Sequence, residues 1–258
     1  MIASRNWFKL GLSLIACNLL ALHYAVAAGN ETPLPKQTWS FSGIFGSFDN
    51  SSIQRGLQVY LEVCANCHGL QYVAYRNLSE VGYGEEQIKS IAAQYEIEDG
   101  PDSEGVMFTR PGRPSDYFAN PYANDEEAAY MNNGAMPPDL SLIYKARPGG
   151  ADYIYAVLTG YEEDNQHEIP DGLYFNTFFP GQAIAMPQPL YGDDVEYQDG
   201  TEASIEQQAK DVTSFLAWAA EPNLNARKRM GLKVILFLIA LTALLYASKR
   251  KIWSDIAH

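Results

Sequence analysis

The sequence predicts a mostly α-helical exported domain with long irregular loops, followed by one C-terminal transmembrane helix. Helical periodicity is confined to a few stretches, and strand signals are weak throughout. The chain also begins with an apolar, signal-like segment and carries a second apolar segment near its C-terminus. At 258 residues with 47% hydrophobic composition, it is long enough for one globular domain in addition to these two segments.

The N-terminal segment has the parts of a secretory signal peptide. Arg5 and Lys9 precede a mainly apolar run that ends in the small residues Ala25-Val26-Ala27-Ala28. We therefore expect residues 1–28 to be removed on export. The alternative is an N-terminal anchor helix, which fits less well because a polar, proline-containing segment follows.

The second apolar segment predicts a membrane anchor. Residues 234–247 carry no charge, and with residues 230–233 the segment approaches the ~20 residues that span a bilayer. A buried core helix is a poorer explanation because basic clusters flank both ends, and for the same reason positive charge alone does not orient the span. The signal peptide orients it. We expect residues 29–225 outside, a span at residues 226–250 and a cytoplasmic tail at residues 251–258.

Within the exported segment, four helices are signposted. Capping residues mark the first two, and the third follows Gly149-Gly150. In the first and last, apolar residues recur in steps of three and four. Between residues 70 and 200 the chain is otherwise rich in Gly, Pro, Tyr and acidic residues, and so long an irregular stretch makes sense in a chain that wraps a prosthetic group. The expected helices start at Ser51 or Ser52, after Asn124, at about Asp152 and at Ser204.

The exported segment is strongly acidic. Residues 29–226 hold nine Lys and Arg against 30 Asp and Glu, a net charge of −21, compared with −13 for the whole chain. Nucleic acid is therefore an implausible partner and a cationic protein a plausible one, although acidity that only keeps the domain soluble explains the same composition. Two clusters are densest: Glu96, Glu98, Asp99, Asp102 and Glu104, and Asp193, Asp194 and Glu196.

The pentapeptide from Cys64 to His68 carries the most specific chemistry. Two thiols three residues apart can add to the two vinyl groups of a haem, and the imidazole that follows can bind the iron. A structural zinc site would need more ligands, and a thioredoxin-like pair would begin a helix after a strand. A simple disulfide would leave His68 unexplained. We therefore expect one covalent haem c, attached through Cys64 and Cys67 and ligated by His68.

Spacing alone leaves the sixth ligand of the iron open. Met186 follows a loop and shortly precedes the last helix of the domain, which is a better position for reaching the open face of a haem than that of Met136. Both remain possible, since most methionines only fill cores. The full set of candidates is Met107, Met131, Met136, Met186 and His167.

Arg147 and Tyr153 are candidates for binding the haem propionates. They flank Gly149-Gly150, and a guanidinium can bind a carboxylate through two hydrogen bonds while a tyrosine hydroxyl can donate a third. A surface ion pair explains Arg147 equally well.

Further sequence blocks extend the pattern far beyond the pentapeptide. They are Phe41-Ser42-Gly43-Ile44-Phe45-Gly46, Gln54-Arg55-Gly56-Leu57-Gln58-Val59-Tyr60, Asn120-Pro121-Tyr122, Asn133-Gly134-Ala135-Met136-Pro137-Pro138-Asp139-Leu140-Ser141, Leu158-Thr159-Gly160-Tyr161, Gly172-Leu173-Tyr174-Phe175-Asn176, Phe179-Pro180-Gly181-Gln182-Ala183-Ile184-Ala185-Met186 and Trp218-Ala219-Ala220-Glu221-Pro222. In this order, and ending in a membrane anchor, they resemble the cytochrome c1 family, the haem subunits of the ubiquinol:cytochrome c oxidoreductase (cytochrome bc1) complex. The resemblance covers nearly all of residues 39–253.

This resemblance implies a class I c-type cytochrome-like haem domain with assigned site residues. The methionine of the family's Gly-Gln-Ala-Ile-x-Met loop falls on Met186, which implies that Met186 is the sixth ligand and that Met136 lines the pocket. Arg147 and Tyr153 match the family's propionate partners, and Pro137-Pro138 matches its haem-packing turn. The chain lacks the extra cysteine pair of some bacterial relatives, and residues 162–171 cannot be aligned, so His167 receives no role.

The resemblance also implies a function and partners. The chain would be a subunit and not an enzyme by itself, accepting one electron from the Rieske iron–sulfur protein and passing it to a c-type cytochrome beside cytochrome b. It would cross the bacterial inner membrane once, with its haem domain in the periplasm. Acidic clusters would steer a basic cytochrome, so association would slow as salt rises. The rival functions are a stand-alone membrane-anchored electron carrier and a haem peroxidase with an open sixth site.

Overall fold

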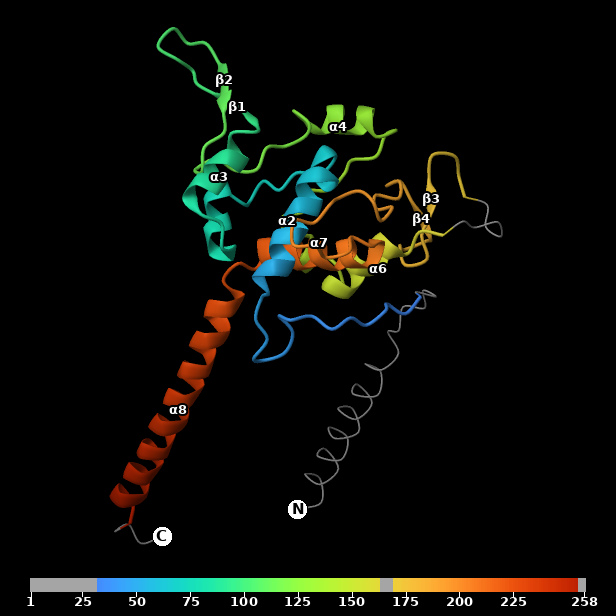
Figure 1. Ribbon diagram of the computed structural model, residues 1–258. Helices are drawn as coiled ribbons and strands as arrows, with labels where there is room; N and C mark the ends of the chain where they lie inside the picture. Colours follow the sequence, from blue (N-terminus) through green and yellow to red (C-terminus); the bar gives the residue numbers. More distant parts are fainter. Residues whose placement is uncertain (1–31, 163–168, 255–258) are drawn as a thin grey trace, which may run out of the picture. The chain divides into compact units, whose positions relative to one another are not determined.

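The structure is a computed structural model that describes residues 32–162 and 169–254. The expected signal peptide and His167 lie outside these residues. As predicted, helices dominate, and the strands form two short antiparallel hairpins, β1–β2 and β3–β4 (Figure 1). In chain order the elements are α2 (Asn50–Glu62), the 3₁₀ helices η1 (Cys64–Asn66) and η2 (Tyr75–Val81), α3 (Glu85–Ala92), β1 (Glu96–Asp99), β2 (Phe108–Pro111), α4 (Asp125–Met131), α5 (Ile143–Ala146), α6 (Ala151–Thr159), β3 (Tyr174–Phe175), β4 (Ala183–Ile184), α7 (Ile205–Ala220) and α8 (Leu224–Ile252).

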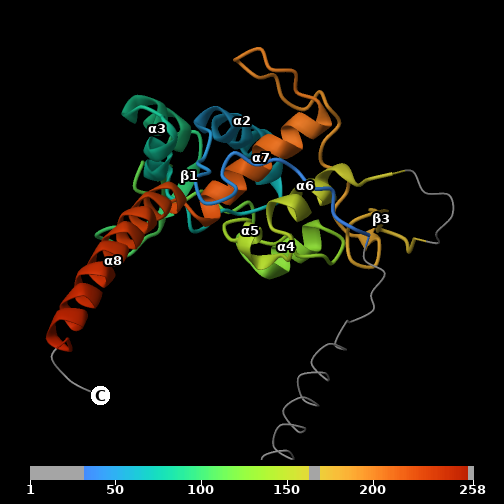
Figure 2. The same ribbon diagram turned by 90° about the horizontal axis from the view of Figure 1, so that it is seen from below.

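Two helices from opposite ends of the domain form its centre. α2 and α7 lie side by side in both views, and α6 packs against α7 (Figures 1 and 2). The apolar stripe expected on α2 is buried, including Ile53, Leu57 and Tyr60. Gly56 allows the two helices to approach closely, because a Cβ at this position would lie 2.1 Å from the backbone oxygen of Asp211. The haem pentapeptide is therefore delivered from a helix held firmly in the core.

One predicted cap was wrong. α2 begins at Asn50, and its cap is Asp49, whose carboxylate accepts a hydrogen bond from the Ser51 backbone N–H at 3.2 Å. Ser52 does not cap the helix, because its hydroxyl donates to Asp211 on α7 at 2.7 Å. This partner lies 159 residues away in the chain, so local sequence gave no sign of it.

The other three expected helices are confirmed. Asn124 caps α4 by accepting from the Glu127 N–H at 2.9 Å, and Ser204 caps α7 by accepting from the Gln207 N–H at 3.3 Å. α6 begins at Ala151, one residue before the expected start. These helices form where sequence predicts them because the caps of α4 and α7, and the glycine pair before α6, are local features.

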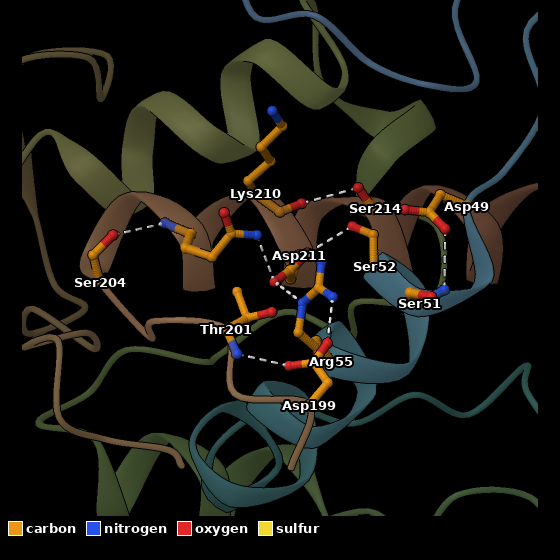
Figure 3. A network of polar contacts seen from close by, with 11 residues as sticks. Asp49, Ser51, Ser52, Arg55, Asp199, Thr201, Ser204, Lys210, Asp211 and Ser214 are labelled. Carbon is orange, nitrogen blue, oxygen red and sulfur yellow. Dashed lines mark hydrogen bonds and ion pairs between the residues drawn. The ribbon is translucent and has the colours of Figure 1, made fainter. Parts of the chain in front are cut away.

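A network of charged and polar groups joins α2 to α7 (Figure 3). Arg55 on α2 donates to both carboxylate oxygens of Asp211 on α7, at 2.8 and 3.0 Å. The same carboxylate accepts from Ser52 at 2.7 Å and from Gln207 at 2.8 Å. Arg55 also donates to the more exposed Asp199 at 2.8 Å. Asp211 is fully buried. Its negative charge is compensated by the Arg55 guanidinium and by two neutral donors, Ser52 and Gln207.

We expect Asp211→Ala to destabilise the domain strongly. The Asp211 side chain is 1% exposed and that of Arg55 is 17% exposed, so the substitution leaves a largely buried guanidinium with one remaining carboxylate. Breaking such a pair costs about 3 kcal/mol. Urea unfolding of the haem-loaded protein in detergent, followed by far-UV circular dichroism, measures the loss. Asp199→Ala is the matched control, because the Asp199 side chain is 46% exposed, and equal losses for the two variants would contradict the account.

The last helix fits a transmembrane helix. α8 has 29 residues, and an 18-residue window within it reaches a mean hydropathy of 2.2. As expected, Glu221-Pro222 lies between the end of α7 and the start of α8. Most of its apolar side chains are exposed, which suits a lipid environment better than a soluble core. The helix extends two residues beyond each end of the span predicted at residues 226–250.

Candidate haem-binding site

A cavity of about 510 Å³ is lined by every residue that the sequence assigned to haem. Segments far apart in the chain meet here: the end of α2, the loop after α4, α6, the loop after β4 and one face of α7. Most of the remaining wall is apolar. The assigned residues in the lining are Cys64, Cys67, His68, Pro137, Pro138, Arg147, Tyr153 and Met186.

The pentapeptide forms one compact turn at the end of α2. The backbone N–H groups of Cys67 and His68 both donate to the Cys64 carbonyl, at 3.1 and 2.9 Å. Both cysteines line the cavity and are not joined in a disulfide. The apolar surroundings of Cys64 raise the pKa of its thiol to about 12, with a smaller contribution from Cys67. The pair follows a helix and does not begin one, unlike the thioredoxin-like arrangement.

His68 presents one defined ring nitrogen for a metal. Its Nδ1 lies 2.8 Å from the carbonyl oxygen of Pro138, which can only accept, so Nδ1 carries the proton and donates. Nε2 therefore keeps its lone pair. Desolvation is the main cause of a lowered pKa of His68, which favours the neutral imidazole. Tyr60 on α2 donates to the backbone oxygen of His68 at 3.0 Å and steadies the turn.

Among the candidate sixth ligands that the structure describes, only two methionines line the cavity. Met136 and Met186 line the cavity, whereas Met107 and Met131 are absent from its lining and are 51% and 64% exposed. Met186 is partly buried, while Met136 is 62% exposed. His167 lies among the residues that the structure does not describe.

Two residues that the sequence did not single out hold the loop that carries Met186. Tyr161 donates from its hydroxyl to the Met186 backbone oxygen at 2.9 Å, and burial raises the pKa of Tyr161, so it stays a donor. Asn176 is fully buried and donates to the Val157 oxygen on α6 at 2.8 Å. Its side-chain oxygen accepts from two backbone N–H groups of the following turn at 3.1 Å. Both residues belong to the blocks quoted above, but only tertiary contacts reveal their positioning role.

Arg147 and Tyr153 both reach the cavity. Arg147 follows the last residue of α5 and is exposed, while Tyr153 lies on α6, where burial raises its pKa. Among residues 32–162 and 169–254, no carboxylate forms an ion pair with Arg147. The surface ion pair considered as an alternative is thus not seen within these residues.

The lining fits a haem c in its chemistry. The apolar wall suits the flat macrocycle, and two thiols and one neutral imidazole occupy the same turn. A thioether is supplied by a separate loop, and a guanidinium and a phenol suit the two propionate carboxylates.

Comparison with known proteins identifies the family of the chain. Residues 39–256 match the model of the Cytochrome C1 family. The chain is 49% identical to cytochrome c1 of Rhodospirillum rubrum, over 95% of this chain and 97% of the relative. It is 47% identical to the mitochondrial cytochrome c1 heme protein of Schizosaccharomyces pombe, over 95% of this chain and 83% of the relative.

A third relative is longer than this chain. The chain is 48% identical to the cytochrome b/c1 of Bradyrhizobium diazoefficiens, over 88% of this chain and 36% of that relative. The resemblance inferred from the sequence blocks is confirmed by all of these matches. The chain belongs to the cytochrome c1 family, the haem c-binding electron-transfer subunits of the cytochrome bc1 complex.

Proposed function

We propose that this chain accepts one electron from the Rieske iron–sulfur protein and passes it to a c-type cytochrome, using a single haem c bound by Cys64, Cys67, His68 and Met186. The observation that carries the proposal is the convergence of all eight expected residues on one cavity. When bound, the haem iron supplies one-electron oxidation and reduction. The chain's own residues fix which of the possible haem reactions occurs.

His68 and Met186 come from separate segments of the lining, and both would hold the iron. The carbonyl of Pro138, two residues after Met136, contacts the ring nitrogen of His68 that faces away from Nε2. Met186 comes from a different loop, held by Tyr161. This supports Met186 as the sixth ligand. A thioether favours ferrous iron and raises the potential, and a filled sixth position opposes the peroxidase chemistry of the rival function.

The remaining lining residues hold the group and exclude water. Apolar side chains such as Leu216 and Val212 on α7 form part of the cavity wall and would keep solvent from the bound group. Arg147 and Tyr153 would bind the propionates, and Pro137-Pro138 would pack against the ring. Tight packing limits rearrangement on electron transfer, which suits an electron carrier.

The location follows from the two end segments. The helix α8 and the bacterial relatives fit a single-pass membrane protein. We place the haem domain, residues 29–225, on the periplasmic side of the bacterial inner membrane, with residues 1–28 as signal peptide and residues 251–258 in the cytoplasm. The strong negative charge of the exported domain would attract a basic cytochrome to it.

The experiment that tests membership of a complex is co-purification. We expect affinity-tagged protein, extracted from its native membrane in mild detergent, to bring cytochrome b and the Rieske protein with it. The preparation should then reduce cytochrome c with quinol as the electron donor. A haem-loaded chain that purifies alone, from membranes in which quinol oxidation is intact, would favour the stand-alone carrier instead.

A further inference from the structure

A loop that the proposed function does not use, residues 41–48, is hydrogen-bonded to the first turns of α8. Lys228 donates from its Nζ to the backbone oxygens of Phe41, Gly43 and Gly46, at 2.6, 2.7 and 3.0 Å. An ammonium group has three N–H donors, so this loop satisfies all three. One turn earlier on α8, the side-chain oxygen of Asn225 accepts from the backbone N–H of Phe48 at 3.1 Å. Residues 41–48 are thus tied to the membrane helix.

The backbone of this loop has a fixed shape. Its ends are closed by a hydrogen bond from the Ser47 N–H to the Ser40 oxygen at 3.0 Å. At Gly46 a Cβ would lie 1.9 Å from the Ser42 oxygen, so the turn is too tight for any other residue. The loop is a rigid turn clamped by Lys228.

Two large apolar side chains stand at the tip of the loop. Phe41 and Phe48, at its two ends, are buried in the core. Between them, Ile44 and Phe45 are 78% and 82% exposed. Adjacent apolar side chains held out on a rigid turn indicate a surface that another apolar phase covers.

The tether places this tip at the membrane surface. The uncharged part of α8 begins at Val234, six residues after Lys228, which is roughly 9 Å along a helix. The headgroup layer outside the hydrocarbon core is of similar thickness, roughly 5–8 Å on each side. A loop clamped to Lys228 therefore lies beside the headgroups when α8 spans the bilayer. Apolar and aromatic side chains are stable at this depth.

We propose that Ile44 and Phe45 insert into the lipid surface around the outer end of α8 and give the domain a second contact with the membrane. Lipid is the favoured occupant because the loop is hydrogen-bonded to the membrane helix itself, two residues before its exposed apolar side chains start at Met230. Two attachment points would restrict rotation of the haem domain about α8.

Photocrosslinking in native membranes tests this proposal. Phe45 is replaced by p-benzoylphenylalanine in the full-length, haem-loaded protein, and the adducts are identified by mass spectrometry after illumination. We expect acyl-chain adducts, as for the same probe at Leu238 within α8, and none for the probe at Tyr130, which is 86% exposed on α4. An adduct with another polypeptide, or no lipid adduct at position 45 while position 238 gives one, would overturn the proposal.

A matched pair of variants tests the tether. With the probe at position 45, Lys228→Met should reduce lipid adducts several-fold, because the loop loses its clamp. Arg229→Met removes the neighbouring positive charge. Arg229 does not bind the loop but donates within α8 to the backbone oxygen of Asn225 at 3.3 Å, so this variant should leave the adducts unchanged. Equal reductions would show that charge, and not the clamp, holds the tip at the lipid, and the tether would be rejected. The haem content of each variant measures whether it folds.

Discussion

Met186→Leu is expected to lower the haem potential by on the order of 0.1 V or more, within the roughly 0.8 V range that axial ligands cover. Leucine has a similar volume but offers no lone pair, so ferrous iron loses the ligand that favours it. Redox titration of the purified protein measures the shift. Quinol-driven reduction of cytochrome c should be impaired in the same variant, because the haem of this protein becomes harder to reduce.

Met136→Leu is the matched control for this prediction. Met136 lines the same cavity but is 62% exposed, and the carbonyl of Pro138, two residues later, accepts from the His68 ring. We expect its potential to stay close to that of the unaltered protein. If the Met136 variant shows the large decrease and the Met186 variant does not, the ligand assignment is wrong.

The second large effect is expected when both cysteines of the pentapeptide are replaced. Cys64→Ala combined with Cys67→Ala removes both sites of thioether formation, so no haem should remain with the chain on a denaturing gel stained for haem. The unfilled cavity of about 510 Å³ should also lower the amount of folded protein in the membrane.

Cys17→Ala is the control for the cysteine variant. Cys17 lies in the expected signal peptide, so its replacement should leave the haem stain unchanged. Covalent haem that survives replacement of both Cys64 and Cys67 would contradict the assigned attachment. Blotting for the chain separates loss of haem from loss of protein.

Local sequence predicted those parts of the fold that depend on neighbouring residues. The buried stripe of α2, the cap Asn124 and the helix that starts near Ser204 are set within one or two helical turns, and the structure has them. Ser52 was misread as a cap because its partner, Asp211, is remote in sequence. The clamp at Lys228 was missed for the same reason, since its partners lie more than 180 residues away.

The candidate site divides in the same way. The spacing of Cys64, Cys67 and His68 identifies haem attachment by itself, because the chemistry needs these residues at that interval. The choice of Met186 over Met136 did not follow from spacing and came from the resemblance of whole blocks. The positioning roles of Tyr161 and Asn176 required coordinates, since a polar residue in a loop does not reveal which backbone group it binds.

The absorption spectrum of the oxidised, intact protein tests the central claim most directly. Ligation by His68 and Met186 predicts a low-spin spectrum with a methionine-to-iron charge-transfer band, and this band should disappear in Met186→Leu while Met136→Leu retains it. A high-spin resting spectrum, or rapid binding of an added ligand to the iron, would contradict a closed electron-transfer site and favour a catalytic haem.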